Sequence, residues 1–385
     1  MKLSPRLAVT LVFAAFGVIG GIWVGSIPAI ARRIGLGEQE LGGVLTLVVL
    51  VNVFAFAGGG QLARFVPGRA MMMAMLPVAA LMLCATLAAP SYWLFLPAVL
   101  AFSVSHGFVD IFMNAEGSAV EAERQRPLLT GMHATVSLTV AVCALLGSLL
   151  SVTFGSLAAA PLLLAAGALG AWVVAHGTPR RAVGGVAAAR TSAPASALSP
   201  GVLLLGLAVG LGTAGELVSF FWSAKLLDTE APSLAAISGI GTVFLCGCAG
   251  FARLFGDRVR ARFGDRNVVV GALAVSAAGM IGVGLTSGFA LHVLGFAVIG
   301  IGTAYLVPCL FAIAANSDPA ARAARIGLMS LIGSPARISA PYLFGWIAQQ
   351  SGAAAAFGLF SIVMVAAGVF FIASQTMMSR RVAMA

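Results

Sequence analysis

Long runs of hydrophobic residues alternate with short polar segments along the whole chain. Residues 7–31 and 41–63 contain no Asp, Glu, Lys or Arg, and residues 70–109 and 127–179 are each long enough for two helices, with breaks at "AAPSYW" and near "SVTFGSLAAAP". A membrane-spanning helix needs about 20 consecutive apolar residues. The second half of the chain repeats the rhythm, with single runs at 200–226 and 231–252 and double runs at 267–317 and 326–379. The pattern therefore predicts an all-α membrane protein with twelve transmembrane helices, six in each half.

The composition supports a membrane setting and excludes several other classes of protein. Hydrophobic residues make up 60% of the chain and charged residues 9%, whereas soluble proteins carry about 25% charged residues. We find no G-x-x-x-x-G-K-[ST] loop, no H-E-x-x-H motif and no loop long enough for a soluble catalytic domain. We therefore expect no enzyme activity, no ATP hydrolysis, no cofactor and no metal site.

Basic residues set the expected orientation, because loops on the cytoplasmic side are enriched in Lys and Arg. With the N-terminus inside and alternating spans, 18 of the 22 basic residues fall on the inner side. Only Arg32, Arg33 and Lys225 fall outside, and Arg337 lies within a span. We therefore expect both termini to be cytoplasmic and the protein to lie in the inner membrane. Basic loops facing anionic lipid account for the net charge of +10 without nucleic acid.

A linker rich in Ala, Gly, Pro, Ser and Arg, "TPRRAVGGVAAARTSAPASALS", divides the chain. It predicts an N-terminal six-helix bundle at 1–177, a cytoplasmic linker at 178–199 and a C-terminal six-helix bundle at 200–385. The two halves echo each other weakly: "GGGQLARFVPGR" follows the second span and "RLFGDRVRARFGDR" follows the eighth. Such parallel six-plus-six repeats place a substrate near the bilayer midplane.

Four stretches carry a resemblance to a known family: "GGIWVGSIPAIARRIGL", "HGFVDIFMNAEGSAVEAERQRPLLTGMH", "GELVSFFWSAKLL" and "FARLFGDRVRARFGDR". The chain resembles bacterial major facilitator superfamily transporters over nearly its whole length, and within them the inner-membrane branch related to fucose-permease-like transporters. The resemblance implies a secondary transporter that works by alternating access, with the first, second, fourth and fifth spans of each half lining a central cavity. One departure is Arg64, which stands near the place of a usual aspartate, although Asp257 is kept in the second copy.

Three charged residues lie near the middle of expected cavity-lining spans. They are Asp110, Glu216 and Arg337. Ionisable residues at this depth are costly and usually face a cavity or a partner. Asp110 is our first candidate for carrying a coupling proton and Glu216 the second, although an aspartate hydrogen-bonded within its own half is the alternative. Arg337 either binds an anionic substrate or pairs internally with one of the two carboxylates.

Other polar and aromatic residues are candidates for contacting a substrate. Asn52 lies in the middle of the second span, where helix-to-helix hydrogen bonding is an equally good interpretation. Aromatic rings at cavity depth can stack on flat organic molecules or simply pack. The candidates are Asn52, His106, Asn114, Trp23, Trp222, Tyr305 and Tyr342.

His106, Asp110, Asn114 and Glu121 share one helical stripe about 22 Å long, whereas Glu116 and Glu123 lie on another face. At the cytoplasmic end we expect charge pairs that form a gate. Glu121, Glu123, Arg124 and Arg126 are expected to pair there with Arg64 or Arg69, or with Arg322 and Arg325 of the other half. His133 and Asp257 complete the gate candidates.

These features support three hypotheses. The first is a monomeric, proton-coupled secondary transporter of a small organic solute in the lipid bilayer. The second is proton-driven efflux of a toxic or lipophilic compound. The third is a membrane receptor built on a transporter fold that moves no solute. Mid-membrane carboxylates favour the first two.

Overall fold

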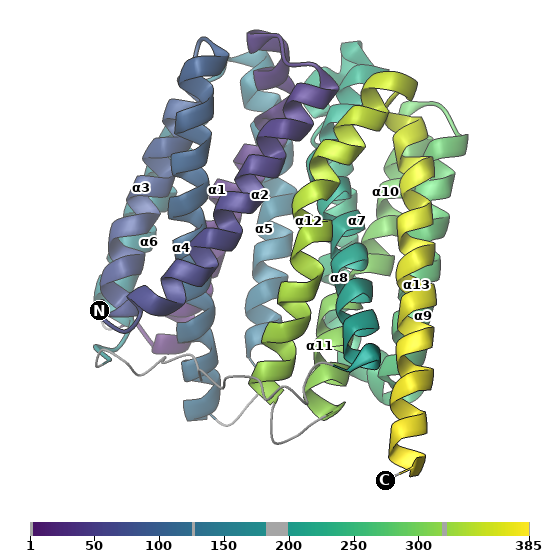
Figure 1. Ribbon diagram of the computed structural model, residues 1–385. Coiled ribbons are helices and arrows are strands. Elements are labelled where there is room, and N and C mark those ends of the chain that lie inside the picture. Colours follow the sequence, from purple (N-terminus) through teal and green to yellow (C-terminus); the bar gives the residue numbers. More distant parts are fainter. Residues whose placement is uncertain (1–2, 125–127, 182–198, 318–321, 385) are drawn as a thin grey trace. The chain divides into compact units, whose positions relative to one another are not determined.

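The computed structural model is helical throughout the part of the chain that it describes, residues 3–124, 128–181, 199–317 and 322–384 (Figure 1). Most breaks between helices fall where the hydrophobic pattern predicts them, but the run at 267–317, predicted as two spans, has an additional break after residue 303. The helices are α1 Pro5–Ile34, α2 Glu38–Leu62, α3 Gly68–Ala88, α4 Tyr92–Arg124, α5 Leu129–Thr153, α6 Ala160–Gly177, α7 Pro200–Glu230, α8 Ile240–Leu254, α9 Gly256–Leu285, α10 Phe289–Thr303, α11 Leu306–Ser317, α12 Arg322–Ser351 and α13 Ala353–Met384, with a short 3-10 helix η2 at Pro232–Ile237.

Within the described residues, 11 helical segments are long and apolar enough to cross a membrane. Helices α10 and α11 together form one of these segments, Phe289–Asn316. Helix α12 has 30 residues but is too polar to qualify, because its sequence carries Arg325 and Arg337 among small and polar residues. The chain is therefore a multi-pass membrane protein, and the count of twelve spans stays a prediction.

Two compact units are present, and neither is continuous in sequence. Unit 1 contains Met1–Gly37, Leu47–Ala188 and Ser223–Gly250, and unit 2 contains Glu38–Thr46, Ala189–Trp222 and Phe251–Ala385. Helices α2 and α7 thus each contribute residues to both units. The sequence predicts two bundles that follow each other along the chain and are divided by a linker. This division stays a prediction.

Glycines bring one pair of helices close together inside each unit. In unit 1, α1 packs along α5, and a Cβ added at Gly21 would lie 2.7 Å from the Val140 carbonyl oxygen. In unit 2, a Cβ added at Gly210 of α7 would lie 2.6 Å from the Cα of Gly333 in α12. Small residues allow membrane helices to approach closely, so that backbone packs on backbone. The first and seventh helices therefore use the same device against their partners.

Around these pairs the remaining helices complete each unit. In unit 1, α3 packs on α4 and α6, and α6 also packs on α1. In unit 2, α9 packs on α10, α11 and α13, and α12 packs on α13 and α11.

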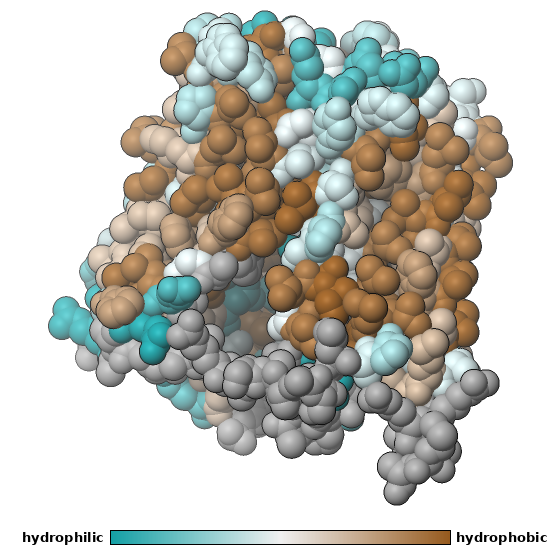
Figure 2. All heavy atoms as spheres, in the orientation of Figure 1, coloured by the Kyte–Doolittle hydropathy of each residue, from teal (hydrophilic) through white to brown (hydrophobic). Residues whose placement is uncertain are grey.

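The outer face of α13 shows what these packed helices present to their surroundings. Figure 2 shows hydrophobic side chains along its visible face, and the exposed ones recur at helical spacing as Leu359, Ile362, Val365, Val369 and Ile372. A helix that exposes such a stripe without polar residues is suited to lipid rather than water.

Candidate functional site

The polar stripe of α4 lies at mid-helix in unit 1, as the sequence predicts. Asn114 Nδ2 donates to Asp110 Oδ1 at 2.7 Å and to the Asp110 carbonyl oxygen at 2.9 Å. No cation lies within ion-pairing distance of Asp110 among the residues that the structure describes. Asp110 is half-buried, and within the described part of the chain its carboxylate has one amide partner and no compensating charge.

One turn before Asp110, His106 is held among aromatic rings. Its Nε2 donates to the carbonyl oxygen of Phe16 at 3.3 Å, and its ring stacks on Phe16 with centroids 3.8 Å apart. Phe102 lies on the same ring cluster, at 5.2 Å from His106 and 5.8 Å from Trp23. Trp23 is buried. This arrangement favours packing over solute contact for Trp23 and fixes the orientation of His106.

Asn52 joins α2 to α4. Its Nδ2 donates to Ser103 Oγ at 2.8 Å and to the Val48 carbonyl oxygen at 3.2 Å, and Ser103 Oγ in turn donates to the same carbonyl at 2.9 Å. Both donor hydrogens of the amide are used in this network. The geometry thus favours the helix-to-helix role over substrate binding for Asn52.

In unit 2, Glu216 of α7 pairs with Arg253 near the end of α8, at 3.3 Å between Oε1 and an Nη atom. Arg253 also donates from Nε to the carbonyl oxygen of Ala304, at 3.2 Å. That carbonyl lies at the break between α10 and α11, and the residue four positions on is Pro308, which has no N–H to give it. Arg253 therefore satisfies a backbone oxygen that the proline leaves without a partner.

Tyr305 lies at the same break. Its hydroxyl donates to the Ala252 carbonyl oxygen at 2.6 Å, beside the end of α8. Tyr305 thus ties α8 to the α10–α11 break, and its only polar atom is already engaged.

Arg337 lies at the middle of α12 and is half-buried. The expected internal pairing with Glu216 or Asp110 is not seen, because Glu216 pairs with Arg253 and Asp110 bonds to Asn114. Arg337 has no ion pair or hydrogen bond among the described residues. The sequence "GSPARISAP" around it runs inside one helix, although that helix contains Pro335 and Pro341.

The two remaining aromatic candidates lie in unit 2. Trp222 is fully buried against Phe344, and its Nε1 donates to Glu38 Oε2 at 3.1 Å. Tyr342 is 43% exposed and accepts a hydrogen bond from Gln39 at its hydroxyl, at 2.9 Å. Both tie the start of α2 to other helices of unit 2.

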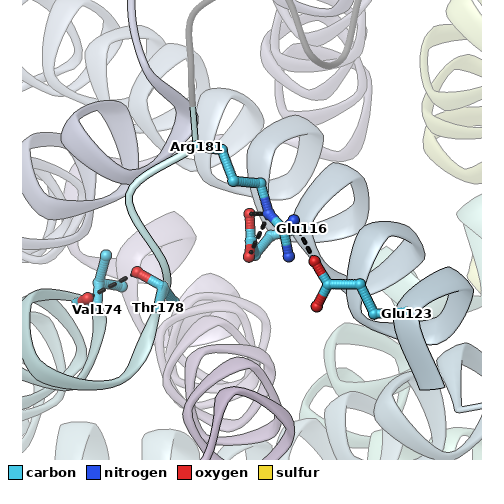
Figure 3. Close-up of polar contacts among 5 residues, drawn as sticks. All are labelled: Glu116, Glu123, Val174, Thr178 and Arg181. Atoms are coloured by element: carbon cyan, nitrogen blue, oxygen red, sulfur yellow. Dashed lines mark hydrogen bonds and ion pairs between the residues drawn. The ribbon is translucent and has the colours of Figure 1, made fainter.

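The acidic end of α4 is paired differently from the expected gate. Figure 3 shows the Arg181 guanidinium between two carboxylates: Nε lies 3.0 Å from Glu116 Oε1, and an Nη atom lies 2.5 Å from Glu123 Oε1. We expected Glu123 to pair with Arg64, Arg69 or arginines of the other half. The structure corrects this, because α6 ends at Gly177 and the chain then brings Arg181 back to α4.

Glu121 is occupied by the helix that follows. Its Oε2 accepts from the backbone N–H groups of Leu128 and Leu129, at 2.6 and 2.8 Å, where α5 begins. Helix starts leave such N–H groups without intrahelical partners, and a carboxylate there is favourable. Glu121 therefore caps α5, a role that its place on the polar stripe did not indicate.

The other gate candidates have varied settings. Arg69 donates to the Ala175 carbonyl oxygen at 2.5 Å, His133 packs edge-on against Phe13, Arg64 and Arg124 are exposed, and Arg325 is half-buried. Arg126 and the side chains of Asp257 and Arg322 lie outside the described residues.

Sequence reasoning missed several partners. Arg253 and Arg181 were counted among inner loop charges, yet each pairs with a carboxylate on a helix. Asp228, 3% exposed, pairs with Arg32 and was not considered. Their position in the sequence could have indicated these pairs, because Asp228 and Glu216 both lie on a long apolar helix, where a carboxylate requires a partner.

Comparison with known proteins adds the family context. No protein-family model matches the chain. The membrane protein MosC of Rhizobium meliloti is 26% identical over 393 residues, covering 96% of this chain and 91% of that protein. An uncharacterized MFS-type transporter of Yersinia pestis is 24% identical over 370 residues, covering 94% of both chains. The uncharacterized transporter y4wD of Sinorhizobium fredii is 26% identical and covers 91% of this chain and 92% of that protein.

Solved structures agree in fold. The nucleoside transporter NupG superposes with a TM-score of 0.75 at 13% identity, covering 96% of this chain and all of that one. A bacterial homologue of the lysosomal transporter Spinster has a TM-score of 0.68 at 14% identity, covering 97% of this chain and 96% of that one. This is the fold of the major facilitator transporters. The chain therefore has this fold and is similar, over nearly its whole length, to proteins described as transporters, as the predicted family resemblance implies. Its assignment to the fucose-permease-like branch stays a prediction.

Proposed function

We propose that this major facilitator protein is a secondary active transporter that moves a small organic solute by alternating access, coupled to protons. The observation that carries the proposal is the carboxylate of Asp110 at mid-helix with Asn114 as its hydrogen-bond partner and no ion pair among the described residues. An unpaired charge at this depth costs several kcal/mol. Binding a proton removes that charge, and losing the proton again requires access to water.

Glu216 is the weaker candidate for the coupling proton. Arg253 already compensates its charge at 3.3 Å, and the same arginine is held by the Ala304 carbonyl. Protonating Glu216 would break the ion pair that already compensates its charge. We therefore assign proton coupling to Asp110 and a structural role to Glu216.

Arg337 supplies the expected solute contact. Its guanidinium has no ion pair among the described residues, and a charged group in a membrane helix is stabilised by an anion. A carboxylate or phosphate can bind its five donors in a bidentate manner. A structural neighbour, human MFSD10, is an organic anion transporter, with a TM-score of 0.67 at 18% identity. We propose an organic anion of metabolite size as the solute.

The proposal includes the topology. Twelve spans, with α12 as the eleventh, would place both termini in the cytoplasm. We also propose that the protein is a monomer in the inner membrane. The excess of basic residues on one side of the predicted spans supports this arrangement.

The first experiment identifies the solute and tests Arg337. Purified protein is screened by thermal shift against organic anions, nucleosides and neutral sugars, because a ligand at 100 times its Kd stabilises the folded state by about 2.7 kcal/mol. Anionic hits should lose most of their shift in Arg337→Gln and part of it in Arg337→Lys, since lysine lacks the planar fork. Hits that are unaffected by both substitutions would remove Arg337 from the binding site.

The second experiment tests proton coupling in liposomes. Asp110→Asn should abolish accumulation driven by an imposed pH gradient and keep both binding and solute-for-solute exchange, which needs no net proton movement. Glu216→Gln is the matched comparison and should retain pH-driven accumulation. Normal accumulation by Asp110→Asn together with its loss in Glu216→Gln would reverse the assignment. Proton-driven movement outward only would favour efflux, and binding without flux for every hit would favour a receptor.

A further inference from the structure

A groove on the surface of unit 2 lies apart from the polar residues described above. It has a volume of about 300 Å³ and runs between α9 and α10, from Val259 and Phe263 to Val275 and Ile301. Its polar atoms are largely engaged: the Tyr305 hydroxyl donates to Ala252, and Asn267 Nδ2 donates to the Phe263 carbonyl. The groove therefore presents an apolar lining.

The groove opens on the outer surface of the unit. Phe263 is 54% exposed, Ile301 46% and Val275 38%, and each belongs to its wall. Gly271 lines the groove and a Cβ built there meets nothing within 4 Å, so the space beside it is empty. An apolar groove open along a membrane helix is suited to hydrocarbon chains rather than to water.

Arginines flank one end of the groove. Arg258, Arg262 and Arg266 each directly precede a residue that lines it, and all three are exposed. Arg262 lies over the Phe263 ring, with its guanidinium carbon 5.5 Å from the centroid. Arg260 is different, because Asp265 neutralises it at 2.7 Å. Three exposed arginines are thus sequence neighbours of residues that line an apolar groove.

We propose that this groove binds an anionic phospholipid, with an acyl chain between α9 and α10 and the headgroup phosphate at Arg258, Arg262 and Arg266. The two parts of such a lipid match the two parts of the site. Basic clusters at the ends of membrane helices attract anionic headgroups, and apolar surface between helices accepts their chains. Gly264, with φ 74°, interrupts the helical backbone of α9 at a kink between Arg262 and Arg266.

Native mass spectrometry of the purified protein tests the headgroup contact. Detergent-solubilised protein is titrated with phosphatidylglycerol and with phosphatidylcholine of identical chains. Phosphatidylglycerol should bind more tightly, and replacing each arginine by Gln should weaken its binding about fivefold, since each basic residue near an anionic headgroup contributes roughly that factor. Arg260→Gln is the matched control and should change the affinity much less.

A second variant pair tests the chain contact. Gly271→Leu fills the groove and should weaken binding of both lipids at least tenfold. Gly282→Leu is the control, because Gly282 lies on the same helix with equally open space and outside the groove. Thermal unfolding midpoints of the two variants should agree within a few degrees, which separates lipid loss from misfolding.

Three outcomes would overturn the proposal. They are equal affinity for the two lipids, an unchanged lipid preference when the three arginines are replaced together, and equal binding by the Gly271→Leu and Gly282→Leu variants. Inorganic phosphate serves as the competitor in the same titration. Displacement of the lipid by millimolar phosphate would show a simple anion site without a chain contact, and would also contradict the proposal.

Discussion

At the scale of single residues, the ion pairs of this protein differ in how much each carboxylate depends on its partner. Glu116 is 9% exposed in its side chain and Glu123 is 51% exposed, yet both contact the same Arg181. The hydrogen bonds that Arg181 donates to Glu123 and Glu116, together with the charges of these carboxylates, raise the pKa of Arg181 above its usual value, so this arginine stays charged at every accessible pH. The buried carboxylate is the one that cannot turn to water when the arginine is lost.

We expect Arg181→Gln to destabilise the protein by about 2 kcal/mol, because it leaves Glu116 with a desolvated charge. Glu123→Gln should cost less than about 1 kcal/mol, since an exposed pair contributes little. The measurement is the thermal unfolding midpoint in detergent. Glu116→Gln combined with Arg181→Gln should recover part of the loss, and a double variant as unstable as the sum of both single variants would contradict the coupling.

At the scale of helices, breaks are sites where side chains complete the backbone. The α10–α11 break follows from Pro308, which removes the donor for the Ala304 carbonyl, and Arg253 from another helix replaces it at 3.2 Å. Glu121 does the reverse for α5, by accepting the N–H groups of Leu128 and Leu129. These two helix ends therefore depend on charged residues that come from other helices.

This dependence predicts a thermodynamic cycle. Arg253→Met should destabilise the protein by about 2 to 4 kcal/mol, because Glu216 loses this ion pair and the Ala304 carbonyl loses this hydrogen bond. In a Pro308→Ala background the carbonyl gains a backbone donor, so the same substitution should cost about 1 kcal/mol less. Unfolding midpoints of the four proteins give the coupling directly, and strictly additive effects would show that Arg253 does not serve the break.

At the scale of the whole molecule, the exposed residues of the outer helices indicate whether the protein is surrounded by lipid or by water. Val365, 55% exposed at the centre of α13, belongs to a hydrophobic stripe of that helix (Figure 2). A soluble protein would tolerate a charge at such a position within about 0.5 kcal/mol. A membrane protein would not, because a lysine at the centre of a membrane helix costs about 2.5 to 3.5 kcal/mol.

Val365→Lys should therefore lower the amount of folded protein in the membrane fraction severalfold. Met377→Lys is the control: Met377 is also exposed, at 46%, but lies near the end of α13, where lysine reaches the membrane surface. Fluorescence-detected size-exclusion chromatography of both variants measures the difference. Equal yields would contradict a lipid-facing α13.

Local features of this protein could be predicted from its sequence, whereas contacts between distant residues could not. The breaks at residues 89–91 and 154–159 and the mid-helix positions of Asp110, Glu216 and Arg337 were predictable, because they follow from local hydrophobicity. The span at α12 was predicted as the first half of the double run at 326–379, although α12 is not among the helices that are apolar enough to cross a membrane. The partners of the charged residues were not predictable: Glu116 and Arg181 are separated by 65 positions, and Glu216 and Arg253 by 37.

The sequence by itself determined the solvent, the helices and the depth of each charge, because the cost of placing a polar group in hydrocarbon acts on every residue separately. Only the tertiary structure decided which charges are compensated. It gave Glu216 an arginine from α8, used Glu121 to cap α5, and left Asp110 with an amide as its partner. Pairing depends on distances between helices, and these are set by contacts such as Gly21 against Val140 and Gly210 against Gly333, which no single segment of the chain encodes.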